Sequence, residues 1–352
     1  WELISTIAEG YRLLRSCACE DALSIFQSLP LSHQNSGWVV CQIARCYFEM
    51  NNYGEADVYY SQVRKVEPYR LEGMEYYSTV LWHLRKNVEL AALAKELVGI
   101  DKTTSEAWVA VGNCFSLQKE NDLAIKFFQR AAQVSPWCAY AYTLCGHEYV
   151  TKDELEKAAG CYRHAIVLDP RHYNAWFGLG MVYFRQDQWG LSLYHFDKAC
   201  KINPMSSVLR CQVGKCFRES GQHETALAHC LAAVKLDEQN GRAKFEVAKV
   251  LVELERYDEA LALLERLRDS TFADAPVYFL LSKIYKHTNK PGEALLNLMT
   301  AVDLDTSQIG STGHMFAMGD ESGANMMVAE DSTLFENSES NLDESESDSL
   351  CS

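Results

Sequence analysis

A small residue returns every 34 positions along this chain, and no insertion or deletion interrupts the frame. A second frame of the same period is mostly alanine and starts at Ala22, and a third is large and apolar and starts at Leu13. A fixed period of this length is typical of stacked helical units, and 34 residues is the tetratricopeptide period. The sequence therefore predicts an all-α tetratricopeptide-repeat superhelical solenoid of about nine 34-residue helix-turn-helix units. The small positions are Gly10, Ala44, Ser78, Gly112, Gly146, Gly180, Gly214, Ala248 and Ser282.

The block that begins at residue 105 shows why the repeat needs these residue types. Trp108, Gly112 and Phe115 recur at the spacing of one face of a helix, and Ala124 and Phe128 do the same on a second helix. We expect the small residues to let the two helices approach closely, while the large rings fill the space beside that contact at interior density. The block from 71 to 104 inverts the small and large positions at Leu90 and Ala94, yet its first-helix pattern is kept, so a helical pair is expected there too.

The repeat frame divides the chain into an array over residues 1–308 and a tail over residues 309–352. The tail loses all periodicity and is rich in Ser, Glu and Asp, so it cannot bury enough apolar surface to order itself. We expect a disordered, solubilising end. Ser345 and Ser347 have acidic neighbours, which leaves a phosphorylated regulatory segment as the alternative.

The charge balance argues against a nucleic-acid partner. Formal net charge is −15, and residues 320–352 hold ten acidic residues and no Lys or Arg, which leaves about −5 for the array. No apolar run has the length of a membrane span, and no signal peptide opens the chain, so no membrane is expected. Residue 1 is Trp, so we expect the sequence to be a fragment of a longer protein.

The sequence contains no motif that predicts catalysis. It lacks a glycine-rich phosphate loop, a nucleophile elbow and a histidine pair at metal-binding spacing. The thirteen cysteines are spaced too widely for a zinc knuckle and recur at fixed repeat phases, so we interpret them as small packing residues in a reducing compartment. We expect a protein that is not an enzyme and has no cofactor and no metal.

Function must then lie in binding on the concave surface, which the first helix of each repeat lines. Groove positions follow from repeat phase, and the blocks from 105 to 206 combine apolar and aromatic groups with one acid and several neutral hydrogen-bonding groups. This mixture suits an extended peptide with an apolar side chain next to a basic one. The candidate peptide-binding residues are Glu106, Asn113, Tyr140, His147, Asn174, Phe177 and Met181.

The next two blocks place basic residues on the same groove phases, with acids among them. A basic stretch of this kind suits an acidic segment or the C-terminal carboxylate of a peptide, although an ordinary solvated face gives the same pattern. The basic residues are Lys215, Arg218, Arg242 and Lys249.

Four segments of the chain are similar to those of one known protein family. They are GWVVCQIARCYFE (37–49), YRLEGMEYYSTVLWHL (69–84), EAWVAVGNCFSLQ (106–118) and HYNAWFGLGMVY (172–183). The stretch in the degenerate block is the most telling, because the general repeat consensus predicts little there. Over about residues 1–305 the chain resembles the cell-division-cycle-27-type subunit of the anaphase-promoting complex.

The resemblance implies a scaffold subunit of a large ubiquitin ligase, nuclear and cytoplasmic, that acts in the cell cycle. In this family the C-terminal repeat array binds the Ile-Arg tails of coactivators and of a core receptor subunit. Other repeat subunits of the complex are also expected partners. Such subunits homodimerise through an N-terminal array, and this chain matches the C-terminal array only. Glu106 is then expected to pair with the peptide arginine, and Phe177 and Met181 to line an isoleucine pocket.

Other readings remain open. A co-chaperone adaptor that grips an acidic chaperone C-terminus needs basic residues beside Asn113, but Val109, Tyr140 and Thr143 supply none. The repeat region of a sugar transferase shows an asparagine ladder at the sixth repeat position, which is absent here. Another repeat subunit of the same ligase is a further alternative.

Overall fold

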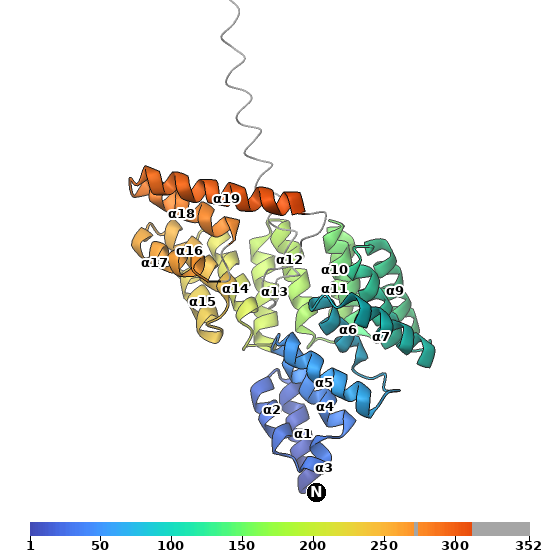
Figure 1. Ribbon diagram of the computed structural model, residues 1–352. Coiled ribbons are helices and arrows are strands. Elements are labelled where there is room, and N and C mark those ends of the chain that lie inside the picture. Colours follow the sequence, from blue (N-terminus) through green and yellow to red (C-terminus); the bar gives the residue numbers. More distant parts are fainter. Residues whose placement is uncertain (271–273, 312–352) are drawn as a thin grey trace, which may run out of the picture.

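The computed structural model describes residues 1–270 and 274–311, with side chains as far as Leu304. The described residues form only helices, paired in antiparallel fashion and stacked along a curved path (Figure 1). The tail over residues 312–352 lies outside the described residues, and the last helix continues three residues past the predicted end of the array at 308. No described helix is long and apolar enough to cross a membrane.

In the described residues nine helix pairs match the nine predicted blocks, and one short extra helix, α3, precedes the second pair. The helices are α1 (Glu2–Arg15), α2 (Cys19–Ser28), α3 (Leu31–Gln34), α4 (Gly37–Glu49), α5 (Tyr53–Val66), α6 (Met74–His83), α7 (Asn87–Ile100), α8 (Ser105–Leu117), α9 (Asn121–Val134), α10 (Ala139–Thr151), α11 (Leu155–Leu168), α12 (Tyr173–Arg185), α13 (Trp189–Ile202), α14 (Ser207–Glu219), α15 (His223–Leu236), α16 (Gly241–Glu253), α17 (Tyr257–Arg268), α18 (Ala275–His287) and α19 (Pro291–Ser311). The predicted tetratricopeptide architecture is confirmed.

The small-residue frame makes room for an aromatic ring from the second helix of the same pair. A Cβ added at Gly146 would lie 2.5 Å from the ring of Tyr162, and one added at Gly112 would lie 2.4 Å from the ring of Phe128. The Tyr162 ring is held from two sides, because a Cβ at Gly178 on the following pair would lie 2.4 Å from it. Real Cβ atoms do not approach so closely, so each of these glycines is required by packing.

The degenerate block folds as predicted, and its two inverted residues compensate for each other. Leu90 and Ala94 exchange the places that alanine and an aromatic residue take in other blocks, and both are buried in the core. The first helix, α6, is shortened at its start, where Gly73 has a φ of 87°. A Cβ at Gly73 would lie 2.6 Å from the sulfur of Cys41, so the turn needs glycine for both conformation and space.

A fourth 34-residue frame is visible only in the backbone. A residue with positive φ lies two positions after the end of every first helix, at positions 17, 51, 85, 119, 153, 187, 221, 255 and 289. In each pair the next N–H donates to the carbonyl of the large apolar frame, as Glu154 N does to Tyr149 O at 2.9 Å. This bond is the long hydrogen bond of a Schellman cap. Only Gly221 is a glycine.

Left-handed backbone favours glycine. At these positive-φ positions, replacing glycine and introducing glycine therefore act differently on the free energy of unfolding. We expect Gly221→Glu to lower the free energy of unfolding by about 1 kcal/mol, although a Cβ there meets nothing within 4 Å. Glu255→Gly, at a φ of 59°, should raise it slightly or leave it unchanged, since the relief of strain exceeds or matches the entropy that glycine loses. Urea denaturation of both variants checks this. Equal destabilisation by both changes would contradict it.

The curve of the stack brings the first two pairs against the start of the sixth. Tyr173 at the start of α12 donates to Glu49 on α4 at 2.8 Å, and Arg171 donates to the carbonyl of Arg15 at 3.0 Å. In Figure 1 the blue helices α1 to α5 accordingly lie directly below α12 and α13. These contacts join residues that are 124 and 156 positions apart in the sequence.

Candidate functional site

The middle of the concave face is occupied by polar and aromatic side chains that bind one another. Asn113 on α8 donates to Ser78 Oγ at 2.8 Å and to Thr79 Oγ1 at 3.1 Å, both on α6. Thr79 Oγ1 also shares a hydrogen bond of 2.7 Å with the hydroxyl of Tyr140 on α10. Two of the predicted binding residues, Asn113 and Tyr140, are thus joined through one threonine, and both are buried.

An arginine extends this cluster toward the N-terminal pairs. The guanidinium of Arg45 lies 3.2 Å from the ring centroid of Tyr76, which in turn packs 4.9 Å from the ring of Tyr140. Arg45 also pairs with Glu49 at 2.5 Å, and Glu49 is the residue that accepts from Tyr173. A cation held by a carboxylate and an aromatic face is well stabilised away from water.

Two carboxylates flank this cluster, and one of them lacks a partner. Glu75 on α6 is half-buried, and its Oε2 atom is buried without a hydrogen-bond partner. Burial, and next the negative charge of Glu106, raise the pKa of Glu75 to about 7, while Arg45 opposes the rise. Glu106 itself is half-buried at the start of α8. A second positive group beside the two carboxylates would satisfy the free oxygen and relieve their repulsion.

The predicted histidine is held inside the pair that carries it. His147 Nδ1 shares a hydrogen bond of 2.6 Å with the hydroxyl of Tyr162. Burial lowers the pKa of His147 to about 3, so the ring is neutral at neutral pH. It can exchange hydrogen bonds with a ligand, but it offers no charge to a carboxylate.

The three candidates on α12 differ in what they expose. Phe177 and Met181 are each 4% exposed and pack in a core cluster with Phe196. Truncation of either side chain therefore acts on folding as well as on any pocket that they back. Asn174 is half-exposed in the first turn of the same helix.

The structure thus brings Asn113 and Tyr140 together and places Glu106 beside an acid, Glu75, that the sequence interpretation did not select. Arg45 is the ninth residue of the block from 37, as Asn113 is of the block from 105. Glu75 is the fifth residue of the block from 71, as Val109 is of the block from 105. Applying those phases to the blocks from 37 and 71 finds both of them. Both residues could therefore be found from repeat phase, but the candidate groove was limited to the blocks from 105 to 206.

The basic residues of the next two blocks surround a buried acid. Glu246 on α16 lies 3.5 Å from Lys215 Nζ and 3.2 Å from Lys249 Nζ. These cations outweigh the cost of burial and lower the pKa of Glu246 to about 2. Arg218 pairs with Glu253 at 2.9 Å. Much of the positive charge in this part of the groove is therefore neutralised internally.

Within the described part of the chain, no group of three or more His, Cys, Asp or Glu side chains is arranged to hold a metal ion. None of the twelve cysteines in that part forms a disulfide, and Cys46 and Cys216 are fully buried in packing positions. Burial raises the pKa of Cys46 to about 12, so its thiol is not activated.

Comparison with family models and solved structures gives the same fold. A model described as the cilia and flagella-associated protein 70 C-terminal domain matches residues 74–276, and a tetratricopeptide-repeat model matches residues 39–69 and 275–308. One chain of the crystal structure of the APC/C hetero-tetramer Cut9-Hcn1 superposes with a TM-score of 0.71, covering 84% of this chain and 57% of that one. The two are 17% identical, which supports the shared fold alone.

Curated relatives are more similar in sequence. The chain is 38% identical over 338 residues to anaphase-promoting complex subunit 3 of Schizosaccharomyces pombe, covering 96% of this chain and 50% of that protein. It is 42% identical over 302 residues to cell division cycle protein 27 homolog B of Arabidopsis thaliana, covering 86% and 41%. It is 54% identical over 134 residues to the human cell division cycle protein 27 homolog, covering 38% and 16%. The chain spans about half the length, or less, of these relatives.

Proposed function

The chain belongs to the family of the cilia and flagella-associated protein 70 C-terminal domain and is a Cdc27-type tetratricopeptide-repeat array, and from this premise we propose that it is part of a non-catalytic scaffold subunit of the anaphase-promoting complex. Its concave face binds C-terminal peptide tails that end in Ile-Arg, on coactivator and receptor subunits. Other repeat subunits of the complex are its neighbours, and the longer protein forms a homodimer. The relatives named as anaphase-promoting complex subunit 3 and Cdc27 homologues support this assignment.

The observation that carries the binding proposal is the carboxylate pair of Glu75 and Glu106. The Oε2 atom of Glu75 is buried without a partner, and repulsion from Glu106 adds to the cost of ionising this acid. The guanidinium of a peptide arginine supplies several donors in a planar fork, which suits two adjacent carboxylates. We place the arginine of the tail between these two side chains.

The remaining candidates then act around the arginine. Asn113 and Tyr140 are held in fixed positions by their hydrogen bonds to Thr79. His147 and Asn174 offer hydrogen bonds to the peptide backbone or its terminal carboxylate. Phe177 and Met181 back the isoleucine pocket from within the core.

A precipitation experiment with immobilised synthetic peptides tests the function. We expect the chain to be retained by a peptide that ends in Ile-Arg. We do not expect retention by a peptide of the same composition in which these two residues are moved from the C-terminus to an internal position. A peptide that ends in Glu-Glu-Val-Asp represents an acidic chaperone tail. Retention by that peptide alone would overturn the proposal in favour of an adaptor that uses the basic residues around Lys215.

Binding should strengthen as pH rises from 6 to 8. The free protein holds a proton on Glu75 because its pKa is raised to about 7, and the bound arginine requires the ionised form. Proton release therefore accompanies binding below pH 7, and the association constant should rise about tenfold over the interval. Glu75→Gln should bind more weakly and show no such dependence. Titration calorimetry at several pH values, with the Ile-Arg peptide, checks this. A flat profile for the unchanged protein would contradict it.

A further inference from the structure

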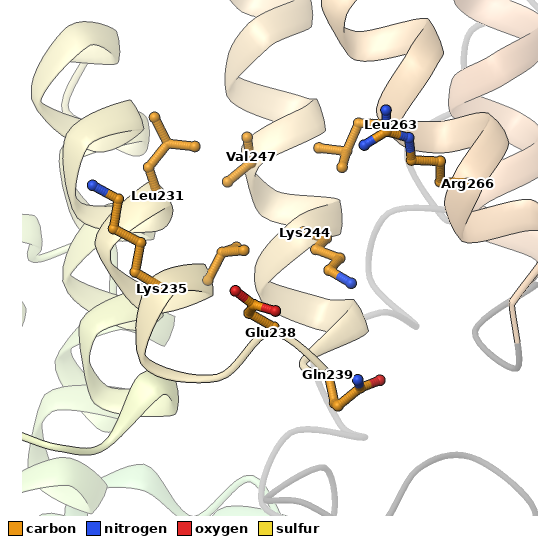
Figure 2. A pocket seen from close by; sticks show the side chains of 9 residues that line it. Leu231, Lys235, Glu238, Gln239, Lys244, Val247, Leu263 and Arg266 are labelled. Carbon is orange, nitrogen blue, oxygen red and sulfur yellow. The ribbon is translucent and has the colours of Figure 1, made fainter.

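A hollow of about 390 Å³ lies among α15, α16 and α17, away from the concave face. Its floor is apolar: Leu231 and Leu263 point toward Val247 from the helices on either side (Figure 2). By repeat phase, none of its lining residues is in a groove position. The hollow is therefore separate from the peptide site proposed above, and its size lies within the range of small ligand pockets.

The rim of this hollow is basic in a chain that is acidic overall. Lys235, Lys244 and Arg266 stand around the apolar floor, with Glu238 as the opposing charge. Among the residues that the structure describes, no carboxylate comes within 4.0 Å of any of these three cations. Elsewhere in the array Lys and Arg are commonly paired, as Lys215 and Arg218 are around Glu246. An apolar floor with unpaired cations at its edge fits an acidic peptide that carries apolar side chains.

The chain itself contains a segment of that chemistry. Residues 326–336 read MMVAEDSTLFE, with apolar residues on both sides of two acids and a third acid at the end. Residues 320–352 contain no Lys or Arg, so the segment has no basic partner of its own. We propose that the hollow among α15, α16 and α17 binds residues 326–336 of the same chain, through apolar contact with the floor and ion pairs with Lys235, Lys244 and Arg266.

The tether is long enough for this contact. α19 packs on α18 and α18 on α17, so two helix spacings of about 8–10 Å each separate the axis of α19 from α17. The tail leaves the C-terminal end of this 21-residue helix, which is about 30 Å long, and these two offsets at right angles give a span of about 35 Å. Residues 312–325 provide up to about 50 Å of extended chain. A tether of this length gives the segment an effective concentration in the millimolar range, so weak contacts are enough to hold it.

Zero-length carbodiimide cross-linking of the full chain, read by mass spectrometry, tests the proposal. It joins an amine to a carboxylate only where the two are in contact. We expect Lys235 and Lys244 to cross-link to Glu330, Asp331 or Glu336 at least fivefold more than two exposed control lysines, Lys95 and Lys126, do. High salt should reduce these products, because the ion pairs are exposed. Equal yields at all four lysines would overturn the proposal.

Two variants separate specific docking from general attraction. Leu334→Ser with Phe335→Ser leaves every charge in place and lies outside the nine repeat blocks, so it does not disturb the array. We expect it to lower the Lys235 and Lys244 products at least threefold, and unchanged yields would refute the apolar contact. Mixing isotope-labelled with unlabelled chains identifies the occupant. If cross-links between a labelled and an unlabelled chain are as abundant as cross-links within one isotope, a second copy supplies the segment. That result would overturn the assignment to the same chain.

Discussion

Gly146→Leu lowers the free energy of unfolding of the array by about 3 kcal/mol, at the upper end of the range for overpacked cores. Even a Cβ at this position lies 2.5 Å from the ring of Tyr162, and that ring has no room to retreat because Gly178 holds its other side. The added side chain must push α10 away from α11, and this displacement opens the neighbouring pairs. Chemical denaturation followed by circular dichroism measures the change.

Gly160→Ala is the matched control, in the partner helix α11. A Cβ at Gly160 meets nothing within 4 Å, so the change affects only helix propensity. It should raise the free energy of unfolding by up to about 1 kcal/mol. If Gly146→Leu unfolds at the same denaturant concentration as the unchanged protein, the 34-residue small frame is not the packing contact that the fold requires.

Glu75→Gln and Glu106→Ala each weaken binding of an Ile-Arg peptide at least tenfold. Each change removes one of the two charges proposed to hold the arginine, and loss of a charge-assisted contact in a half-buried site commonly costs more than about 1 kcal/mol. Glu75→Gln keeps the shape of the side chain, and the hydrogen bonds from Ser78 and Thr79 to the Glu75 backbone carbonyl are unaffected. Fluorescence anisotropy of a labelled peptide gives the affinities.

Glu224→Ala provides the control, because it removes one negative charge from an exposed position on α15, outside the groove. Its affinity should match that of the unchanged protein within twofold. A general effect of net charge would weaken all three variants alike. Full binding by both Glu75→Gln and Glu106→Ala would move the site to other blocks, with the cations around Glu246 as the next place to examine.

The architecture could be predicted from the sequence because the information is repeated nine times. The same contact between a small residue and a ring is made by Gly112 with Phe128 and by Gly146 with Tyr162. One altered block, as at Leu90, therefore does not obscure the pattern. The left-handed frame could not be predicted, since only Gly221 among its nine members is a glycine. The Schellman bond is formed by backbone atoms, and the repeat imposes it on residues that do not favour it.

The candidate site could be predicted only in part. Repeat phase predicts which way a side chain faces, and on that basis Asn113 and Tyr140 were selected as groove-side residues. It does not show that Thr79 already joins them. The contact of Tyr173 with Glu49 links positions 124 residues apart, and a solenoid in which repeats touch only their neighbours gives no reason to expect it. Superhelical curvature produces such contacts, and curvature is the sum of many small packing angles.

A double-mutant cycle between Glu106 and the last residue of the peptide tests the central proposal most directly. The affinities of the unchanged protein and of Glu106→Ala are measured for a peptide that ends in Ile-Arg and for one that ends in isoleucine and citrulline, the neutral analogue of arginine. If Glu106 contacts the arginine, the unchanged protein binds the citrulline peptide more weakly than the arginine peptide. The Glu106→Ala variant then binds the two peptides equally, and the coupling energy is at least about 1 kcal/mol. A coupling energy of zero, with both peptides weakened equally by Glu106→Ala, would contradict the placement of the peptide arginine in this groove.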